Sequence, residues 1–331
     1  MSRSIGSSLS MMALSSRRER VLAAGQRWVI WALLLVGCSS PPPVSKYENL
    51  FYGRDPDAIE DKKLRLDLYL PDSKARPVPL LIYIHGGGWL QGSKEDCPKR
   101  RVTKRDYALA CLNYRFSDRA LFPAQIQDVK QGVRWLRANA KQYGLDPNRF
   151  GAWGPSAGGH LSSLLGTSAG VGSLEKPGED LSISSAVQAV CNWYGVTDFT
   201  QVPEAFSEAA SQAVWEKYQN RRWFNYTWVT HHLVGGPVSQ RRQLAAQANP
   251  IAYIDPSDPP FFILHGEQDS VVPISQSELL AAALEAHQVP VEFIRDRHRG
   301  HDHTGPNGDR FDPQLIDSAI DFFDRQLPGN Q

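Results

Sequence analysis

The stretch Gly154-Pro155-Ser156-Ala157-Gly158 is the strongest indication of how this chain folds. It directly follows residues 150–153, a short apolar run that is typical of a buried strand. A serine between two glycines after a strand matches the nucleophile elbow, a turn so sharp that bulky residues do not fit beside the serine. With 26 glycines in 331 residues, the pattern arises by chance in about one such chain in ten. The rest of the sequence therefore has to support it.

Strand-like and helical segments alternate along the chain. Residues 63–70 alternate polar and apolar side chains, which is typical of a strand with one solvated face. Apolar runs typical of buried strands cover residues 80–84, 107–113, 150–153, 186–191, 260–264 and 291–294. Amphipathic helical segments cover residues 126–139, 158–165, 275–286 and 314–326. This alternation predicts an α/β fold with a mostly parallel, doubly wound sheet. Ligands bind beyond the carboxyl ends of such strands, so the residues just after each strand are the candidates for a site.

The N-terminal segment has the features of an export signal. Four arginines between Arg17 and Arg27 precede an apolar run at 28–36 that is too short to span a membrane. The run ends at Gly37-Cys38, which resembles the bacterial lipoprotein signal with its lipidated cysteine. We therefore expect a signal peptide over 1–37, lipid attachment at Cys38 and an extended tether over 38–48. An ordinary secretory signal is the alternative, and both place the protein outside the cytoplasm, on the periplasmic side if it is anchored.

Charge and cysteine content limit the classes of partner. Removal of residues 1–37 takes away five arginines and one glutamate, so the formal charge changes from +1 to −3. No basic stripe remains, and we expect no nucleic-acid partner. Of the cysteines after Cys38, we expect Cys111 and Cys191 to be small buried apolar residues and Cys97 to be a free thiol.

One segment, about 200–248, interrupts the alternation and is rich in aromatic residues. We expect a helical cap insertion there that buries most of these rings in a small core of its own; the alternative is a cap in which one or two of the rings contact substrate. The aromatic residues are Phe206, Trp215, Tyr218, Trp223, Phe224, Tyr226 and Trp228. The segments on either side belong to a single predicted domain, residues 49–331.

A glycine-rich loop follows the first fully apolar strand, in His85-Gly86-Gly87-Gly88-Trp89. Successive glycines leave backbone N–H groups free to converge on a developing oxyanion, and an HGGG run is the known partner of the elbow. We therefore expect the amides of Gly87, Gly88 and Ala157 to form an oxyanion hole. His85 is expected to brace the loop by hydrogen bonds.

A nucleophilic serine needs a histidine base and an acid that orients it, and in this arrangement both follow the serine in the chain. The strand at 260–264 leads into a turn that contains Asp269, the preferred acid; Glu267 and Asp198 are the alternatives.

The preferred base is His301, because Gly300 lets the chain turn toward the serine; His298 and His303 remain open. These histidines together with Asp302 also allow a metal site as a minor alternative. His160 lies on the helix after the elbow and is expected to pack against a neighbouring loop.

Taken in order, these motifs resemble the α/β-hydrolase superfamily, and more narrowly its esterase branch of hormone-sensitive-lipase-like and BD-FAE (acetyl-xylan/feruloyl esterase) enzymes. The resemblance extends from about residue 50 to the C-terminus and includes residues 66–71, 85–89, 113–115, 122–125, 154–161 and 259–273. It implies hydrolysis of carboxylic esters by a Ser156-Asp269-His301 triad, with no metal and no organic cofactor. Pro155 departs from the branch, which usually has an acidic residue there.

The sequence thus predicts an exported, lipid-anchored serine esterase for short acyl groups, acetyl above all. Its expected substrates are small-molecule or polysaccharide-linked esters. An amidase of the formamidase type and a serine peptidase are the enzymatic alternatives. A non-catalytic binding lipoprotein on the same fold is the alternative from another class.

Overall fold

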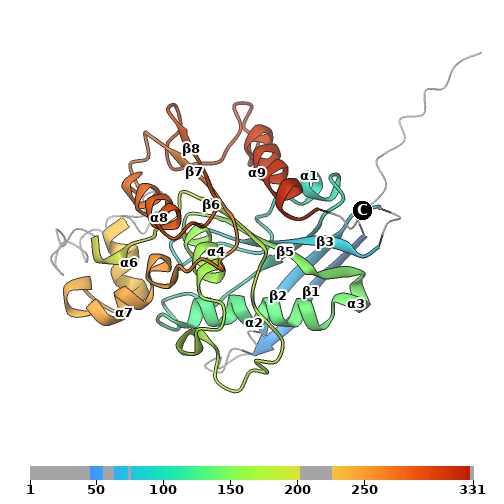
Figure 1. Ribbon diagram of the computed structural model, residues 1–331, viewed down its shortest axis with the longest axis horizontal. Helices are drawn as coiled ribbons and strands as arrows, with labels where there is room; N and C mark the ends of the chain where they lie inside the picture. Colours follow the sequence, from blue (N-terminus) through green and yellow to red (C-terminus); the bar gives the residue numbers. More distant parts are fainter. Residues whose placement is uncertain (1–44, 55–62, 74–75, 202–225, 329–331) are drawn as a thin grey trace, which may run out of the picture. The chain divides into compact units, whose positions relative to one another are not determined.

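An eight-stranded sheet forms the centre of the part of the chain that the structure describes (Figure 1). The structure is a computed structural model that describes residues 45–54, 63–73, 76–201 and 226–328, all within one compact unit. The strands lie in the order β1-β2-β4-β3-β5-β6-β7-β8. They are β1 (Ser45–Arg54), β2 (Lys63–Leu70), β3 (Val78–Ile84), β4 (Ala108–Leu112), β5 (Leu145–Pro155), β6 (Ala189–Trp193), β7 (Phe261–Gly266) and β8 (Val291–Asp296).

The mostly parallel sheet confirms the predicted fold class. Strand β2 runs antiparallel to both of its neighbours, β1 and β4, and all other neighbouring pairs are parallel. Strand β1 was not predicted, and it begins at Ser45, so the last four residues of the predicted tether, 45–48, are strand instead. Pairing with β2 supplies the hydrogen bonds that extend the sheet over this segment. Residues 1–44, including Cys38, lie outside the described residues.

Helices cover both faces of the sheet. They are α1 (Lys99–Thr103), α2 (Ala124–Ala138), α3 (Ala140–Tyr143), α4 (Ala157–Thr167), α6 (Tyr226–Val234), α7 (Arg242–Gln247), α8 (Ser275–Ala286) and α9 (Pro313–Gln326). Short 3-10 helices cover Gly172–Leu174, Phe199–Gln201, Val238–Gln240 and Pro250–Tyr253. Within the described ranges, no helix is both long and apolar enough to cross a membrane.

The pleat of the sheet divides the core into two layers. In β3, Leu80, Ile82 and Ile84 belong to the layer with α2, α4 and α8, whereas Leu81 and Tyr83 belong to the layer with α1 and α9. Figure 1 shows α9 and α1 on one side of the sheet and α2 on the other. Alternate side chains of a strand point to opposite faces, so a continuously apolar strand serves both layers.

Local sequence explains why α9 begins where it does. The side chain of Asp312 caps the helix by accepting a hydrogen bond from the Gln314 amide at 2.8 Å, and Pro313 occupies the first turn. The apolar positions of the helix then recur on one face and are buried against the sheet, at Leu315, Ile316, Ala319, Ile320, Phe322 and Phe323.

Strand order places a crevice at the centre of the sheet. The chain passes from β3 outward to β4 and then returns to the other side of β3 to form β5. Strand order thus reverses between β3 and β5, whose carboxyl ends lie side by side at Tyr83 and Trp153. A reversal of this kind leaves a crevice for ligands. The glycine-rich loop after β3 and Ser156 after β5 both lie at this point.

The described part of the insertion differs from the core that we predicted for it. Val229 and Leu233 of α6 and Ala245 of α7 pack into the same core layer as α2 and α4. These helices therefore extend the main core and do not enclose a separate one. Residues 202–225, with most of the aromatic residues named above, lie outside the described residues, and Trp228 is partly buried against the main core.

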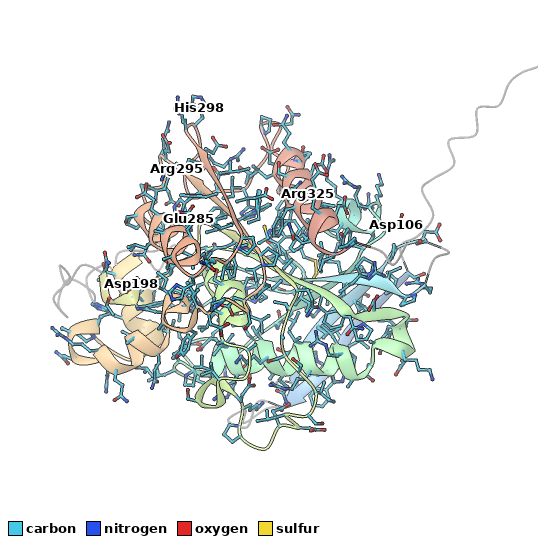
Figure 2. The ribbon with its side chains drawn as sticks, in the orientation of Figure 1. Asp106, Asp198, Glu285, Arg295, His298 and Arg325 are labelled. Atoms are coloured by element: carbon cyan, nitrogen blue, oxygen red, sulfur yellow. A yellow bond between two sulfur atoms is a disulfide. The ribbon has the colours of Figure 1, made fainter. Side chains whose placement is uncertain are left out.

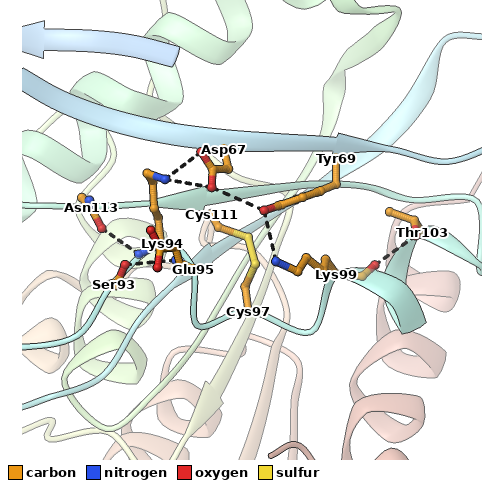
Figure 3. Close-up of a disulfide and its surroundings, with 10 residues drawn as sticks. All are labelled: Asp67, Tyr69, Ser93, Lys94, Glu95, Cys97, Lys99, Thr103, Cys111 and Asn113. Atoms are coloured by element: carbon orange, nitrogen blue, oxygen red, sulfur yellow. Dashed lines mark hydrogen bonds and ion pairs between the residues drawn. A yellow bond between two sulfur atoms is a disulfide. The ribbon is translucent and has the colours of Figure 1, made fainter. Parts of the chain in front are cut away.

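The prediction of a free Cys97 is wrong, because Cys97 forms a disulfide with Cys111 of β4 (Figure 3). Cys97 lies in the loop that leads from β3 to α1, and it is buried in the same core layer as Cys111 of β4. Cys191 is the free cysteine among the described residues, and it is buried as expected. The disulfide ties the glycine-rich loop's far end to the sheet.

The double variant Cys97→Ser/Cys111→Ser is expected to lose stability. The two cysteines are 14 residues apart, and opening a loop of about that length costs about 3 kcal/mol through the added freedom of the unfolded chain. Urea unfolding of the wild-type and variant proteins, both purified without reductant, measures the difference. A Cys191→Ser variant is the matched control, and equal midpoints for wild type and double variant would contradict the prediction.

Candidate active site

Ser156 occupies a strained turn between β5 and α4. Its φ of 55° lies in a region that residues with side chains rarely adopt. A Cβ atom on Gly154 would lie 2.4 Å from the carbonyl oxygen of Ile84, and one on Gly158 would lie 2.0 Å from that same atom. Both flanking positions therefore require glycine, because the end of β3 passes directly against the turn. The Ser156 amide donates to the Trp193 carbonyl at 2.8 Å, which ties the turn to β6.

A continuous chain of hydrogen bonds connects Ser156, His301 and Asp269. Nε2 of His301 lies 3.0 Å from Oγ of Ser156, and Nδ1 of His301 lies 2.7 Å from Oδ2 of Asp269. A carboxylate can only accept, so Nδ1 carries the proton and Nε2 is left to accept the serine hydroxyl. The structure thus brings together the three side chains that we predicted, in the order that activates a serine.

The Asp269 carboxylate is buried and held on both oxygens. Its Oδ1 accepts from the amides of Val271 and Val272 at 2.8 and 2.9 Å. Burial by itself would raise the pKa of Asp269, but hydrogen bonds from His265 and His301 outweigh it and lower the pKa below its ordinary value. The group is therefore a fixed anion against the imidazole of His301.

The alternative acids, Glu267 and Asp198, and the exposed alternative base, His298, do not line the cleft that contains Ser156. Glu267 is exposed, and Asp198 accepts hydrogen bonds from Thr200 and Asn249. His298 is also exposed, and Figure 2 shows it at the outer end of the loop after β8. None of the three makes a hydrogen bond to Ser156 or His301.

The position of the His301 loop has a different cause from the one that we predicted. A Cβ atom at Gly300 would make only an ordinary contact, 3.5 Å from the nearest atom, so glycine is not required there. A Cβ atom at Gly266 would lie 2.0 Å from the Arg299 carbonyl oxygen. The loop after β8 therefore reaches the serine because it packs against the bare backbone of Gly266 at the end of β7.

His303 lies in the same cleft but is bonded elsewhere. Its Nδ1 accepts from the hydroxyl of Tyr194, and its ring stacks on Phe311 at 4.9 Å between centroids. Burial lowers the pKa of His303 to about 4, so the ring is neutral at neutral pH. The Tyr194 ring also packs edge-on against His301, with centroids 4.7 Å apart.

His160 is buried and packs against a neighbouring loop, as predicted. Its Nε2 donates to the Ala248 carbonyl at 2.8 Å, and its Nδ1 accepts from the indole of Trp89 at 3.2 Å. Both nitrogens are used, so the ring anchors the helix after the elbow to the residues around it.

The loop after β3 presents free backbone donors to the same cleft. The amides of Gly87 and Gly88 donate no hydrogen bond to any described residue, and both glycines line the cleft with Ser156. Ala157 is the first residue of α4, so its amide lies at the N-terminal end of that helix. As predicted, His85 braces the loop: its Nδ1 lies 2.8 Å from the Gly86 carbonyl oxygen and its ring stacks on Tyr114.

Buried contacts that we did not predict anchor the far side of this loop. Lys94 and Asp67 of β2 form an ion pair at 2.8 Å, with both side chains at least 94% buried (Figure 3). The Lys94 amide also donates to the Asn113 side chain at 2.7 Å. Together with the adjacent disulfide, these contacts tie the loop after β3 to β2 and to β4. The sequence offers only a weak signal for these contacts, because Lys94 and Asp67 belong to no recognisable motif and Asp67 is one polar position of an alternating strand.

The cleft around Ser156 has a volume of about 700 Å³. Its apolar lining comes from the segments after β6 and β7 and from α6, as Val196, Val229, Val271 and Val272. The loops after β3 and β8 contribute polar and aromatic side chains: Gln91, Asp96, Asp302, His303, Thr304, Arg310 and Phe311. Arg310 forms an ion pair with Asp96 across these two loops. In the described ranges, no group of three or more His, Cys, Asp and Glu side chains is arranged to hold a metal ion.

The buried His85 and His160 and the half-buried His303 predict a loss of stability in acid. Burial lowers the pKa of His85, His160 and His303 to about 4, whereas the unfolded chain has the ordinary value near 6.5. Between these values the unfolded state binds more protons, so the free energy of unfolding falls as the pH is lowered from 6.5 to 4. The expected loss at pH 5 is on the order of 2 kcal/mol per histidine.

Urea unfolding at pH 7.5 and pH 5 measures this loss, and His160→Gln should show a smaller one than the wild type. Asp258 acts in the opposite direction, because burial raises the pKa of its carboxyl to about 6. A free energy of unfolding that stays level or rises between pH 7.5 and 5 would contradict the prediction.

The BD-FAE family model matches residues 66–284, which is more than half of the chain. The chain belongs to the BD-FAE family. The matched segment contains the glycine-rich loop, Ser156 and Asp269, whereas His301 lies beyond it. The sheet with its flanking helices and the similarity to solved esterase structures identify the fold as an α/β-hydrolase fold.

Several known proteins are similar to this chain. Esterase LipQ of Mycobacterium tuberculosis is 34% identical over 65% of this chain and 48% of its own length. A solved bifunctional GH43-CE protein of Bacteroides eggerthii is 34% identical, with a TM-score of 0.70, over 86% of this chain and 38% of its own. A truncated carbohydrate esterase from gut microbiota is 28% identical, with a TM-score of 0.70, over 86% of this chain and 97% of its own. The chain spans about half the length of the curated relatives that it matches.

Proposed function

We propose that this protein is a serine hydrolase of carboxylic esters. The observation that carries the proposal is the hydrogen-bond chain from Ser156 through His301 to the buried carboxylate of Asp269, next to the unbonded amides of Gly87 and Gly88. Similarity to proteins named esterases supports the same reaction.

In the proposed mechanism, Oγ of Ser156 attacks the ester carbonyl while Nε2 of His301 takes its proton. The negative charge that develops on the carbonyl oxygen is stabilised by the amides of Gly87, Gly88 and Ala157, each of which contributes roughly 3 kcal/mol. His301 returns the proton to the leaving alcohol, which leaves an acyl group on Ser156. A water molecule, deprotonated by His301, then releases the acid. Asp269 stabilises the imidazolium in both halves of the reaction.

The proposed substrates are esters of short acyl groups, acetyl above all, on small molecules or polysaccharide. The cleft supports this choice, because small valine side chains and polar groups line it together with Ser156. The solved relatives named as a carbohydrate esterase and as a GH43-CE protein also support it.

We also propose that the protein is exported and anchored by a lipid on Cys38. The disulfide between Cys97 and Cys111 supports export, because such bonds persist in oxidising compartments. A Cys38→Ser variant should appear in the soluble fraction of the periplasm, whereas wild type should sediment with the membranes. Sedimentation of both with the membranes would contradict the anchor.

A substrate panel tests the proposed activity. Acetylated xylan, a feruloylated sugar, p-nitrophenyl esters of two to eight carbons and formylkynurenine are compared by kcat/KM. We expect the acetyl esters to be the fastest and the rate to fall with acyl length. Fast turnover of formylkynurenine alone would replace the esterase with a formamidase, and no turnover together with no labelling by a fluorophosphonate would favour a binding protein.

A further inference from the structure

We propose that His265 is a positioning residue that holds the Asp269 carboxylate in place for catalysis. The inference rests on the proposed function, in which Asp269 orients His301. His265 is the penultimate residue of β7, and its side chain is fully buried, as is that of Asp269. It does not line the cleft, so it acts on the reaction only through Asp269.

Two imidazoles meet at one oxygen of Asp269. Nε2 of His265 lies 3.2 Å from Oδ2, the same oxygen that Nδ1 of His301 approaches to 2.7 Å. Oδ1 is already occupied by the amides of Val271 and Val272. His265 therefore places a donor beside the same carboxylate oxygen that bonds His301.

The surroundings of His265 determine which of its nitrogens carries the proton. Nε2 also lies 2.9 Å from the Val272 carbonyl oxygen, so both of its neighbours are acceptors and the nitrogen must be protonated. In the neutral ring Nδ1 then accepts, and its neighbour is the hydroxyl of Ser277 in α8, at 2.7 Å. The two acceptors at Nε2 thus select the tautomer whose N–H faces Val272 and Asp269, and the Ser277 hydroxyl donates to Nδ1.

This arrangement links the acid turn to α8 and limits the movement of the carboxylate. The groups that face Asp269 and can titrate are His265 on β7, His301 on the loop after β8 and Tyr194 after β6. Tyr194 packs edge-on against both imidazoles, with centroids 6.3 Å from His265 and 4.7 Å from His301. A donor on Oδ2 both fixes the rotamer of Asp269 and disperses its charge.

The test compares His265→Leu, which removes the donor at similar size, with His265→Gln, whose amide can donate from the position of Nε2. For hydrolysis of p-nitrophenyl acetate, we expect His265→Leu to lower kcat by about 10- to 100-fold with KM unchanged, because the base loses its orientation. We expect its acid limb in kcat/KM to move to higher pH, since a carboxylate with one donor fewer holds a proton on the His301–Asp269 pair more tightly. His265→Gln should restore both quantities toward wild type, and Ser277→Ala should lie between wild type and His265→Leu.

A stability-matched control separates positioning from general damage. Lys130 of α2 is a buried cation outside the cleft that bonds Glu175 and the Ser168 carbonyl, and Lys130→Met removes it. It should lower the unfolding midpoint without moving the acid limb. A wild-type kcat and acid limb in His265→Leu would overturn the inference, as would equal loss in the Leu and Gln variants with no shift of the limb. Ser156→Ala, assayed in parallel, distinguishes these results from a failure of the proposed esterase activity, because it must be inactive if that activity is correct.

Discussion

Replacement of Ser156 by alanine is expected to lower kcat for p-nitrophenyl acetate by about 10⁴- to 10⁶-fold, which is the cost of removing the nucleophile from such a triad. The variant keeps its fold at this position, because alanine fits the same turn with the loss of one hydroxyl. It should also lose labelling by a fluorophosphonate, which needs the Oγ that His301 activates. Stopped assays and mass spectrometry of the labelled peptide measure the two effects.

A serine on the surface gives the matched control. Ser257 is exposed and bonds only within its own turn, to Asp255. Ser257→Ala should therefore keep both activity and labelling. Hydrolysis by Ser156→Ala at the wild-type rate would contradict the mechanism, and a labelled residue other than Ser156 would move the nucleophile elsewhere.

The second large effect is expected from Asp269→Asn, which should lower kcat by about 10⁴-fold. The amides of Val271 and Val272 donate to Oδ1, so they select the carbonyl oxygen of the asparagine for that side. The NH₂ group then faces Nδ1 of His301, which has to become the acceptor. Nε2 of His301 consequently carries the proton and can no longer take one from Ser156.

Two further carboxylates serve as controls for this variant. Glu267→Gln and Asp198→Asn remove the alternative acids, neither of which contacts His301, and both should keep kcat near the wild-type value. A circular dichroism melt and an assay near pH 9 distinguish the wrong tautomer of His301 from a lost fold. A variant with only the wrong tautomer should melt as a folded protein and show more activity near pH 9 than at neutral pH. An inactive Glu267→Gln beside an active Asp269→Asn would reverse the assignment of the acid.

The elbow and the strands could be predicted because their causes are local. A continuously apolar run predicts a buried strand because the pleat turns alternate side chains to opposite faces. The glycines beside Ser156 predict the elbow because a sharp turn leaves no space for side chains. The structure adds only the neighbour that makes the space small, which is the carbonyl of Ile84 at the end of β3. The HGGG loop could be predicted for the same reason, since free amides after a strand need no distant partner.

The disulfide could not be predicted in this way. Cys97 and Cys111 pair because the fold brings the loop after β3 against β4. The number of cysteines in the sequence does not reveal which of them come together. The link between His265 and Asp269 is similar, since residues four apart in a turn meet only when β7 ends in the required geometry. The buried pair of Lys94 and Asp67 also depends on a contact between β2 and the loop after β3.

The sequence by itself determined the α/β class, the glycine-rich loop and the candidate nucleophile Ser156, because each depends on periodicity or on the sterics of one turn. Only the tertiary structure decided which of three histidines faces that nucleophile. Ser156 and His301 are separated by 145 residues, and they meet because the loop after β8 packs on the bare backbone of Gly266. A contact of that kind depends on the position of β7 in the sheet, which local sequence does not encode.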